Sequence, residues 1–179
     1  MPIMDHFLEE VVVKKNNTIN RILYYFSWVV MILAAVFASM NLGTLSINFN
    51  WITVAMTVLS AGVAVYIWFF KDRLLTEYEY TFTNGSLDFA EVYNNKKRKS
   101  LGSLNVKNVE AFGKVSSDSF NRYINMPGIK KMNWFLNRDA ELYYFYFTKD
   151  SDKKMIILEP SEEMVSYIKQ YLPQGAYRE

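Results

Sequence analysis

Residues 22–40 have the sequence ILYYFSWVVMILAAVFASM, in which no side chain carries a charge. As a helix, a stretch of this length extends about as far as the hydrocarbon core of a bilayer, roughly 30 Å. A second stretch, WITVAMTVLSAGVAVYIWFF, occupies residues 51–70. The interval from Ile22 to Phe70 contains no Asp, Glu, Lys, Arg or His. The sequence therefore predicts a transmembrane hairpin within residues 18–73, with spans at about 22–40 and 51–70 and a short connection, 41–50.

The charges that flank the two stretches predict their orientation. Lys14, Lys15 and Arg21 precede the first stretch, Lys71 and Arg73 follow the second, and the connection between them has no charge. Lys and Arg are enriched in the cytosolic flanks of membrane spans. We therefore expect a cell-membrane protein with two spans and with both termini in the cytosol.

A cleaved signal peptide is the main alternative for the first span. Ala38-Ser39-Met40 weakly resembles a small-residue cleavage site. However, the apolar stretch is longer than the hydrophobic region of a typical signal peptide, and the charged segment before it is also long. The sequence therefore favours a retained helix.

Small residues recur at four-residue spacing in both spans and predict close helix packing. The candidate packing residues are Ala34, Ala38, Ser60, Gly62 and Ala64. They fit packing within the hairpin and also fit a homodimer face. Neither span has an ionisable residue of the kind that marks ion paths and proton relays, so a transporter or channel acting alone is disfavoured.

The N-terminal segment, residues 1–17, has an amphipathic pattern. Met4, Phe7, Leu8, Val11 and Val12 fall on one face of a helix. This pattern predicts a short helix that lies either on the cytosolic membrane surface or against the C-terminal domain.

Residues 77–179 change from helical to two-residue periodicity. Tyr78, Tyr80 and Phe82 alternate with polar residues, and Asn84-Gly85 is a strong signal for a hairpin turn. Further strand-like segments follow, including two at 142–147 and 155–158 that are apolar on both faces and should be covered. Ser161 then starts a C-terminal helix as its N-cap. We expect an α+β domain, an antiparallel meander or partly open barrel capped by one helix.

The segment YEYTFTNGSLD at residues 78–88, followed by a basic hairpin and by Leu101 to Phe112, resembles the opening of bacterial pleckstrin-homology-like (PH-like) domains that follow a transmembrane hairpin. The order of elements, including MDHFLEEVVVKK at residues 4–15, also resembles a family of small two-helix membrane proteins of Gram-positive bacteria whose function is unknown. The resemblance implies a fold and a membrane location, and it carries no catalytic motif. The first hairpin turn has no Lys or Arg, so the resemblance does not extend to phosphoinositide binding.

A block of four basic residues is the densest charge cluster. It consists of Lys96, Lys97, Arg98 and Lys99. Near a cytosolic membrane surface such residues attract anionic lipid by about 1 kcal/mol each. The alternative is a hairpin turn that is charged for solubility.

The stretch 116–140 is long for a connection within a compact domain. It mixes aromatic residues with Arg122, Lys130 and Lys131, a composition that suits a protein or membrane interface. Trp134 or Phe135 in this stretch equally fits a short strand that joins the core.

Several classes of function are disfavoured by composition. The chain has no cysteine, a single histidine and a net charge of +2. These counts disfavour disulfides, metal sites, histidine or cysteine catalysis and nucleic-acid binding. No glycine-rich phosphate loop or nucleophile elbow is present. We therefore expect no cofactor, no metal and no enzymatic activity.

The leading hypothesis is a membrane-anchored module that binds the bilayer's lipid headgroups or a protein partner at the cytosolic surface or in the membrane. The alternative hypothesis is an auxiliary subunit that packs through its helices on a transporter or channel. The sequence leaves the oligomeric state open.

Overall fold

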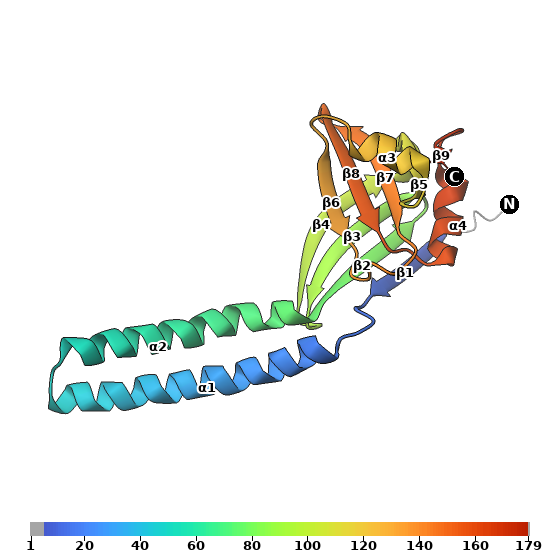
Figure 1. Ribbon diagram of the computed structural model, residues 1–179. Helices are drawn as coiled ribbons and strands as arrows, with labels where there is room; N and C mark the ends of the chain where they lie inside the picture. Colours follow the sequence, from blue (N-terminus) through green and yellow to red (C-terminus); the bar gives the residue numbers. More distant parts are fainter. Residues whose placement is uncertain (1–5, 179) are drawn as a thin grey trace. The chain divides into compact units, whose positions relative to one another are not determined.

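The computed structural model describes residues 6–178 and divides the chain into two compact units, each of which is described by itself (Figure 1). The helical unit consists of residues 16–76. The sheet unit combines the residues up to Lys15 with those from Glu77 onward. The helical unit is thus inserted into the sequence of the sheet unit. The sequence predicted that residues 1–17 form a segment separate from residues 77–179. In the structure, the described residues up to Lys15 belong to the same unit as those from Glu77 onward.

The helical unit contains two long helices, α1 (Thr18–Ile47) and α2 (Trp51–Phe70), and a short 3-10 helix, η1 (Lys71–Leu75). Both long helices are sufficiently long and apolar to cross a membrane. The two uncharged stretches lie within them.

Helix α1 continues to Ile47, well beyond Met40, where the first span was expected to end. Polar side chains in this part of the chain bond to carbonyls of the preceding helical turn. Asn41 Nδ2 donates to the Phe37 carbonyl at 2.8 Å, and Ser46 Oγ donates to the Leu42 carbonyl at 3.1 Å. Since their polar groups are satisfied within the helix, these residues do not break it. The connection is therefore shorter than predicted.

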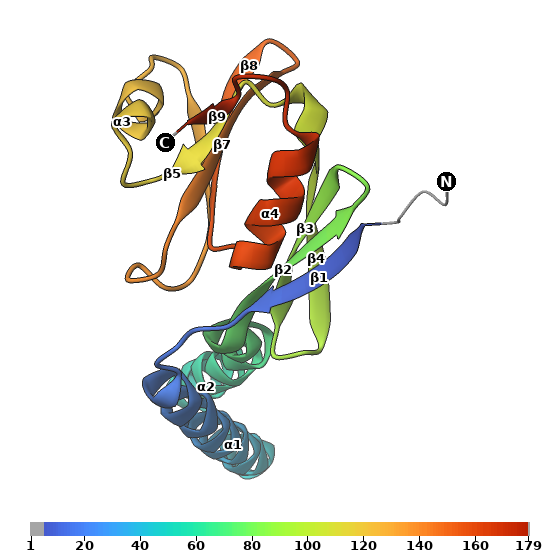
Figure 2. The same ribbon diagram turned by 90° about the vertical axis from the view of Figure 1, so that its right-hand side faces the viewer.

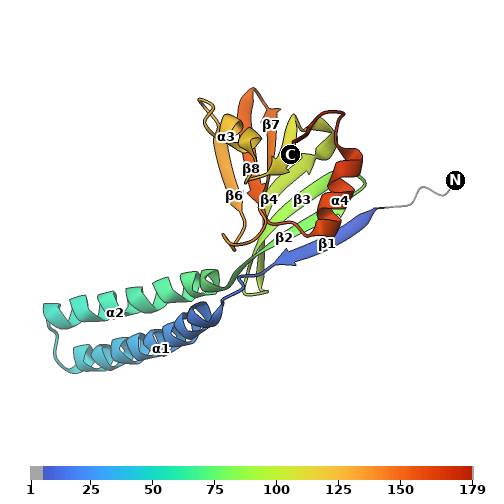
Figure 3. The same ribbon diagram turned by 45° about the vertical axis from the view of Figure 1, so that its right-hand side comes forward.

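The sheet unit consists of two sheets and two helices. Sheet A has the strand order β1-β2-β3-β4 (Figure 3), and sheet B has the order β6-β8-β7-β5-β9 (Figure 1). The strands of sheet A are β1 (Phe7–Val12), β2 (Thr76–Thr83), β3 (Ser86–Tyr93) and β4 (Lys97–Asn105). Those of sheet B are β5 (Ala111–Lys114), β6 (Lys130–Trp134), β7 (Tyr143–Lys149), β8 (Asp152–Leu158) and β9 (Tyr177–Arg178). The α-helices are α3 (Asp118–Ile124) and α4 (Glu162–Tyr171), and a 3-10 helix, η2 (Val106–Asn108), follows sheet A.

The N-terminal segment forms strand β1, so the predicted amphipathic helix is wrong. Exposed Phe7, Glu9 and Val11 alternate with the less exposed Leu8, Glu10 and Val12. This alternation is the pattern of a strand with one covered face. Strand β1 pairs antiparallel with β2 over its full length, from Phe7 opposite Thr83 to Val12 opposite Tyr78. The β2 backbone provides hydrogen-bond partners that a helix at this position would leave unpaired. Met4 lies outside the described residues.

The predicted hairpin between β2 and β3 is present. Its turn residues Asn84 and Gly85 both have positive φ, 49° and 90°. Asn and Gly tolerate this left-handed region better than other residues. Gly85 also needs to be small, because a Cβ there would lie 2.5 Å from the Tyr171 ring of α4.

The main core lies between the sheets and α4. It contains Tyr80, Phe82 and Phe89 from sheet A, Phe145 from sheet B and Ile168 from α4. A second, smaller cluster lies on the other face of sheet B, under α3. Figure 2 shows α3 and α4 on opposite sides of sheet B. Strand β7 is covered on both faces, which explains its uninterrupted run of apolar residues.

The stretch 116–140 contains α3 and β6, so it is not an irregular loop. Trp134 packs against the main core, with its ring 4.7 Å from that of Phe89. Phe135 packs against the second cluster. Both aromatic residues therefore contribute to the core.

Helix α4 starts as predicted. Ser161 Oγ accepts a hydrogen bond from the Met164 backbone N–H at 3.1 Å, and Met164, Val165 and Ile168 are buried. The sheets do not form a closed barrel. Sheet B also departs from a simple meander, because β6 pairs with β8 and β5 with β9 in parallel. The predicted α+β class, with an antiparallel sheet and a C-terminal helix, is confirmed.

Candidate functional site

The directions of the four strands in sheet A determine where the basic cluster lies. Strand β1 runs toward the helical unit and β2 starts from it. Strand β3 runs back antiparallel to β2, and β4 starts from the same end, with Tyr93 opposite Lys97. The turn between β3 and β4 therefore lies at the end of sheet A that is joined to the helical unit. Neighbouring strands are about 4.8 Å apart, so across the sheet the turn is roughly 5–10 Å from the start of β2 and roughly 10–15 Å from the segment that follows β1.

The turn itself is built by two asparagines. Asn94 and Asn95 have φ of 51° and 52°, the left-handed conformation that Asn tolerates better than most residues. The chain then enters β4 through Lys96 and Lys97, which are exposed. Lys99 is exposed on the same strand. We call the residues from Asn94 to Lys99 the basic turn.

Arg98 differs from its neighbours because it bridges strands. Its guanidinium forms an ion pair with Glu79 on β2 and lies 3.5 Å from a Glu9 carboxylate oxygen on β1. Arg98 is thus engaged with sheet A, and the positive charge that the turn presents to solvent comes from Lys96, Lys97 and Lys99.

The other predicted basic residues lie elsewhere in the sheet unit. Arg122 is exposed on α3, and Lys130 and Lys131 are exposed at the start of β6. Strand β6 runs from there toward Asn137, which bonds to the segment that follows β1. Lys130 also pairs with Asp152 and so lowers the pKa of that carboxyl group. The structure does not bring these three residues together with the basic turn.

Four of the five candidate packing residues lie on the covered sides of α1 and α2. Ala38 is buried, and Ala34, Ser60 and Ala64 are half-buried. Gly62 is exposed, and a Cβ at this position would have no atom within 4 Å. Gly62 therefore takes no part in the packing of this hairpin, because it lies outside the covered stripe of α2.

The helical unit has a buried cation that the sequence pattern did not reveal. Lys71 is only 5% exposed. Its ammonium nitrogen lies 4.9 Å from the ring centre of Trp28 and 4.4 Å from that of Trp68, and it donates to the Trp68 carbonyl at 3.2 Å. It is also 3.9 Å from an Asp72 carboxylate oxygen. Cation–π contacts on both rings link α1 to the end of α2.

Asn137 is buried and fastens the segment between β1 and α1 to the sheet unit. Its Oδ1 accepts from the Lys15 backbone N–H at 2.8 Å, and its Nδ2 donates to the Val13 carbonyl at 2.9 Å. Its Nδ2 and backbone N–H also donate to the Glu159 carboxylate, at 2.8 and 3.0 Å. Lys15 is held further by an ion pair with Asp139 at 3.3 Å.

Glu10 extends the contacts between β1 and α4. One of its carboxylate oxygens accepts from the Ser161 backbone N–H at 3.0 Å. Burial raises the pKa of the Glu10 carboxyl, and the bond from Ser161 opposes this effect. Nearby, His6 Nδ1 lies 3.0 Å from the Tyr171 hydroxyl, and its ring stacks on that of Tyr167. Strand β1 is therefore fastened to α4 as well as to β2.

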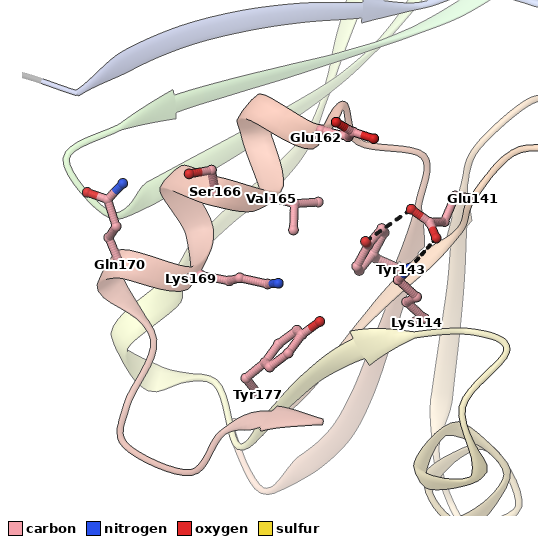
Figure 4. Close-up of a pocket in the computed structure, with 9 residues that line it drawn as sticks. All are labelled: Lys114, Glu141, Tyr143, Glu162, Val165, Ser166, Lys169, Gln170 and Tyr177. Carbon is pink, nitrogen blue, oxygen red and sulfur yellow. Dashed lines mark hydrogen bonds and ion pairs between the residues drawn. The ribbon is translucent and has the colours of Figure 1, made fainter. Parts of the chain in front are cut away.

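A groove of about 620 Å³ lies between α4 and sheet B (Figure 4). On the sheet side, Lys114 forms an ion pair with Glu141, which also accepts from the Tyr143 hydroxyl at 3.2 Å. The hydrogen bond from Lys114 lowers the pKa of the Glu141 carboxyl. On the α4 side, the Lys169 ammonium lies 4.0 Å from the ring centre of Tyr177. The groove is lined by oppositely charged groups that largely neutralise each other.

A family model described as "Bacterial PH-like domain (DUF6106)" matches residues 4–178. The match spans nearly the whole chain, including both long helices. The chain belongs to this family. No curated protein and no solved structure matches it significantly. The family description identifies a PH-like fold and states no activity, so any function for this PH-like protein must be argued from its own residues.

The acidic residues of this PH-like protein form no metal site within residues 6–178. No group of three or more His, Asp or Glu side chains in that range could hold a metal ion. Glu9 and Glu10 lie on opposite faces of β1, and Glu162 and Glu163 occupy the first turn of α4.

Proposed function

We propose that this PH-like protein is a membrane-anchored, non-enzymatic interaction module. In this proposal the helical unit forms a transmembrane hairpin, and the basic turn binds anionic lipid headgroups at the cytosolic surface. The observation that carries the proposal is the position of the basic turn at the end of sheet A that is joined to the helical unit.

The pairing of β1 with β2 supports the membrane topology. The chain enters the helical unit after β1 and leaves it into β2, and these strands are neighbours in one sheet. A single sheet cannot have strands on both sides of a bilayer, because its polar edge groups would lie in hydrocarbon. Both ends of the hairpin must then be on the same side of the bilayer. A hairpin that crosses the bilayer twice has its ends in this arrangement. The flanking Lys and Arg residues favour the cytosol for that side.

The position of the basic turn and the exposure of its lysines support contact with lipid. Lys96, Lys97 and Lys99 are exposed, and their turn is roughly 5–10 Å across the sheet from the start of β2, which follows the hairpin in the sequence. Electrostatic attraction to anionic lipid extends over about 8–10 Å from the surface at physiological salt. Three lysines attracted by about 1 kcal/mol each would hold the basic turn against an anionic leaflet.

The test uses the full chain in vesicles. The chain has no cysteine, so Ser100→Cys provides a single site for an environment-sensitive fluorophore beside the basic turn. Lipids that carry a quencher in the headgroup should quench this fluorophore. The quenching should increase with the anionic lipid content of the vesicles and decrease with added salt. Neutralising Lys96, Lys97 and Lys99 with Gln should abolish the increase.

The matched control neutralises Arg122, Lys130 and Lys131 instead, which removes the same charge from other parts of the sheet unit. This control variant should respond to anionic lipid almost as the wild type does. If the two triple variants respond equally, the basic turn has no special role and only net charge matters.

The auxiliary-subunit hypothesis rests on a different observation. An apolar groove of about 520 Å³ runs between α1 and α2, lined in part by Ala35, Ala64 and Trp68. Close approach of another helix needs small residues such as Ala35 and Ala64. Enlarging the groove residues, by Ala35→Leu and Ala64→Leu, should then prevent co-purification with a transporter or channel while leaving lipid contact by the basic turn unchanged.

A further inference from the structure

The outer edge of β1 can be identified from its hydrogen bonds. The His6 carbonyl accepts from the Asn84 backbone N–H at 3.0 Å, and the His6 N–H donates to the Asn84 side chain at 3.0 Å. In an antiparallel pair, alternate residues direct their backbone groups to the partner strand. Leu8, Glu10 and Val12 therefore bond toward β2, and Phe7, Glu9 and Val11 direct their N–H and C=O groups outward.

The segment after β1 gives the same assignment independently. Asn137 bonds to the Val13 carbonyl and to the Lys15 N–H, both at odd-numbered positions. The side chain of Asn137 thus caps the outer edge at this end. Within the described part of the chain, no strand pairs with the outer edge from Phe7 to Val11. A row of backbone donors and acceptors is left open to another strand.

The side chains along this edge are apolar. Among the described residues of the sheet unit, the exposed large apolar side chains are Phe7, Val11 and Val13, with 59, 47 and 50% of their surface accessible. All three lie on the same side of β1 or its continuation. Exposed edges are usually protected by charged residues, and β4, at the other edge of sheet A, has Lys97 and Lys99. The Phe7 to Val11 edge lacks such basic protection.

The charge between the apolar residues is negative. Glu9 lies between Phe7 and Val11 on the same face and is exposed. Its nearest cation, Arg98, is shared with Glu79, so one guanidinium faces two carboxylates. A strand that adds to this edge would therefore gain from a Lys or Arg opposite Glu9.

A second copy of the chain fits poorly at this edge. Antiparallel self-pairing from Phe7 to Val11 would put Glu9 directly opposite the same residue of the other copy, and like charges in this position are destabilising. A register shifted toward the C-terminal end of β1 would need the outward groups of Val13, whose carbonyl is bonded to Asn137. The edge is thus more complementary to a different protein.

We propose that the outer edge of β1, from Phe7 to Val11, is a docking site for an extended segment of a partner protein. The segment adds as an antiparallel strand, with a Lys or Arg opposite Glu9 and apolar residues opposite Phe7 and Val11. Backbone hydrogen bonds supply affinity in this mode of recognition, and alternate side chains supply specificity. The site is separate from the basic turn and does not depend on lipid binding.

The test uses full-length protein in detergent micelles and two synthetic peptides as probes. One has the sequence Thr-Val-Thr-Lys-Thr-Val-Thr, and the other has Glu in place of Lys. The Lys peptide should bind roughly tenfold more tightly than the Glu peptide, from opposite-charge and like-charge cross-strand pairs. Glu9→Lys should reverse this preference. Asp88→Lys, at an exposed position of β3, should leave it unchanged.

Amide exchange distinguishes strand addition from general attraction of charge. The Lys peptide should slow the exchange of the outward amides of Phe7, Glu9 and Val11. A Lys peptide with methylated backbone nitrogens should fail to do so, since the methyl groups remove its donors and keep its carbonyls from approaching these amides. Equal binding of both peptides, or exchange unaffected by either, would overturn the proposal. Concentration-dependent dimers that protect the same amides would show that a second copy occupies the edge.

Discussion

Val12 and Tyr78 are paired residues in neighbouring antiparallel strands, although both long helices lie between them in the sequence. This pairing makes the helical unit an insertion between the first two strands of a PH-like domain. A protein that begins at Glu77 would consequently lack an edge strand of its own sheet.

The first prediction follows from this insertion. Replacing residues 16–76 with a short Gly-Ser linker should give a soluble, folded domain, because β1 stays joined to β2. A protein starting at Glu77 should be less stable by about 3 kcal/mol or more, because burial of Leu8 and Val12 is lost. Urea unfolding of both proteins measures the difference. Equal midpoints and slopes would mean that β1 contributes nothing to the fold.

A second prediction concerns helix α4. Ile168 is fully buried in the main core, so Ile168→Asp should destabilise the sheet unit by several kcal/mol through burial of an unpaired charge. Ser166→Asp, at an exposed position of the same helix, should have little effect. Thermal unfolding provides the comparison. A melting temperature that Ile168→Asp does not lower would show that α4 does not pack on the sheets.

A third prediction concerns Asn137. Asn137→Ala should cost about 3 kcal/mol, since the Val13 carbonyl, the Lys15 N–H and Glu159 each lose a partner. The Lys15 amide should also exchange faster. The control is Asn121→Ala, at an exposed position of α3. If both variants have the same stability, the segment after β1 is held by other contacts.

A fourth prediction concerns pH. Burial raises the pKa of Glu10 above its ordinary value near 4.5, so the folded protein holds this proton more tightly than the unfolded chain. The contribution of Glu10 therefore favours folding at low pH and is lost as the pH rises through its folded-state pKa. The stability of the wild type minus that of Glu10→Gln should decrease as the pH rises from about 4 toward neutrality.

Urea unfolding across this pH range tests that difference, with Glu162→Gln as the control at an exposed position. The subtraction is needed because Asp139, Glu141 and Asp152 have lowered pKa values, which make stability fall toward acid pH. A difference that stays constant, or that increases with pH, would show that folding does not raise the pKa of Glu10.

The elements that could be predicted from the sequence are those with a local physical cause. The absence of charge from Ile22 to Phe70 predicts two long apolar helices, and Asn84-Gly85 predicts a turn with positive φ. Ser161 predicts the start of α4 because an N-cap needs only nearby backbone groups. The family resemblance added the PH-like fold, which the family match confirms.

The features that could not be predicted depend on partners distant in the sequence. The segment from Phe7 to Val12 fits both helical and two-residue periodicity, and its pairing with β2 decides between them. The engagement of Arg98 with Glu79 depends on the order of strands in sheet A. Asn137 is a single polar residue outside any motif, and its burial follows from the meeting of three segments.

The topology of the helical unit can be measured with single cysteines in intact cells. Asn48→Cys lies in the connection between α1 and α2, and Lys96→Cys lies in the basic turn, at a position without the positive φ of Asn94 and Asn95. If the sheet unit is cytosolic, a membrane-impermeant thiol reagent should label Asn48→Cys in intact cells and should label Lys96→Cys only after the cells are opened. Labelling of Lys96→Cys in intact cells, or labelling of neither site until the cells are opened, would contradict a hairpin that holds the sheet unit at the cytosolic surface.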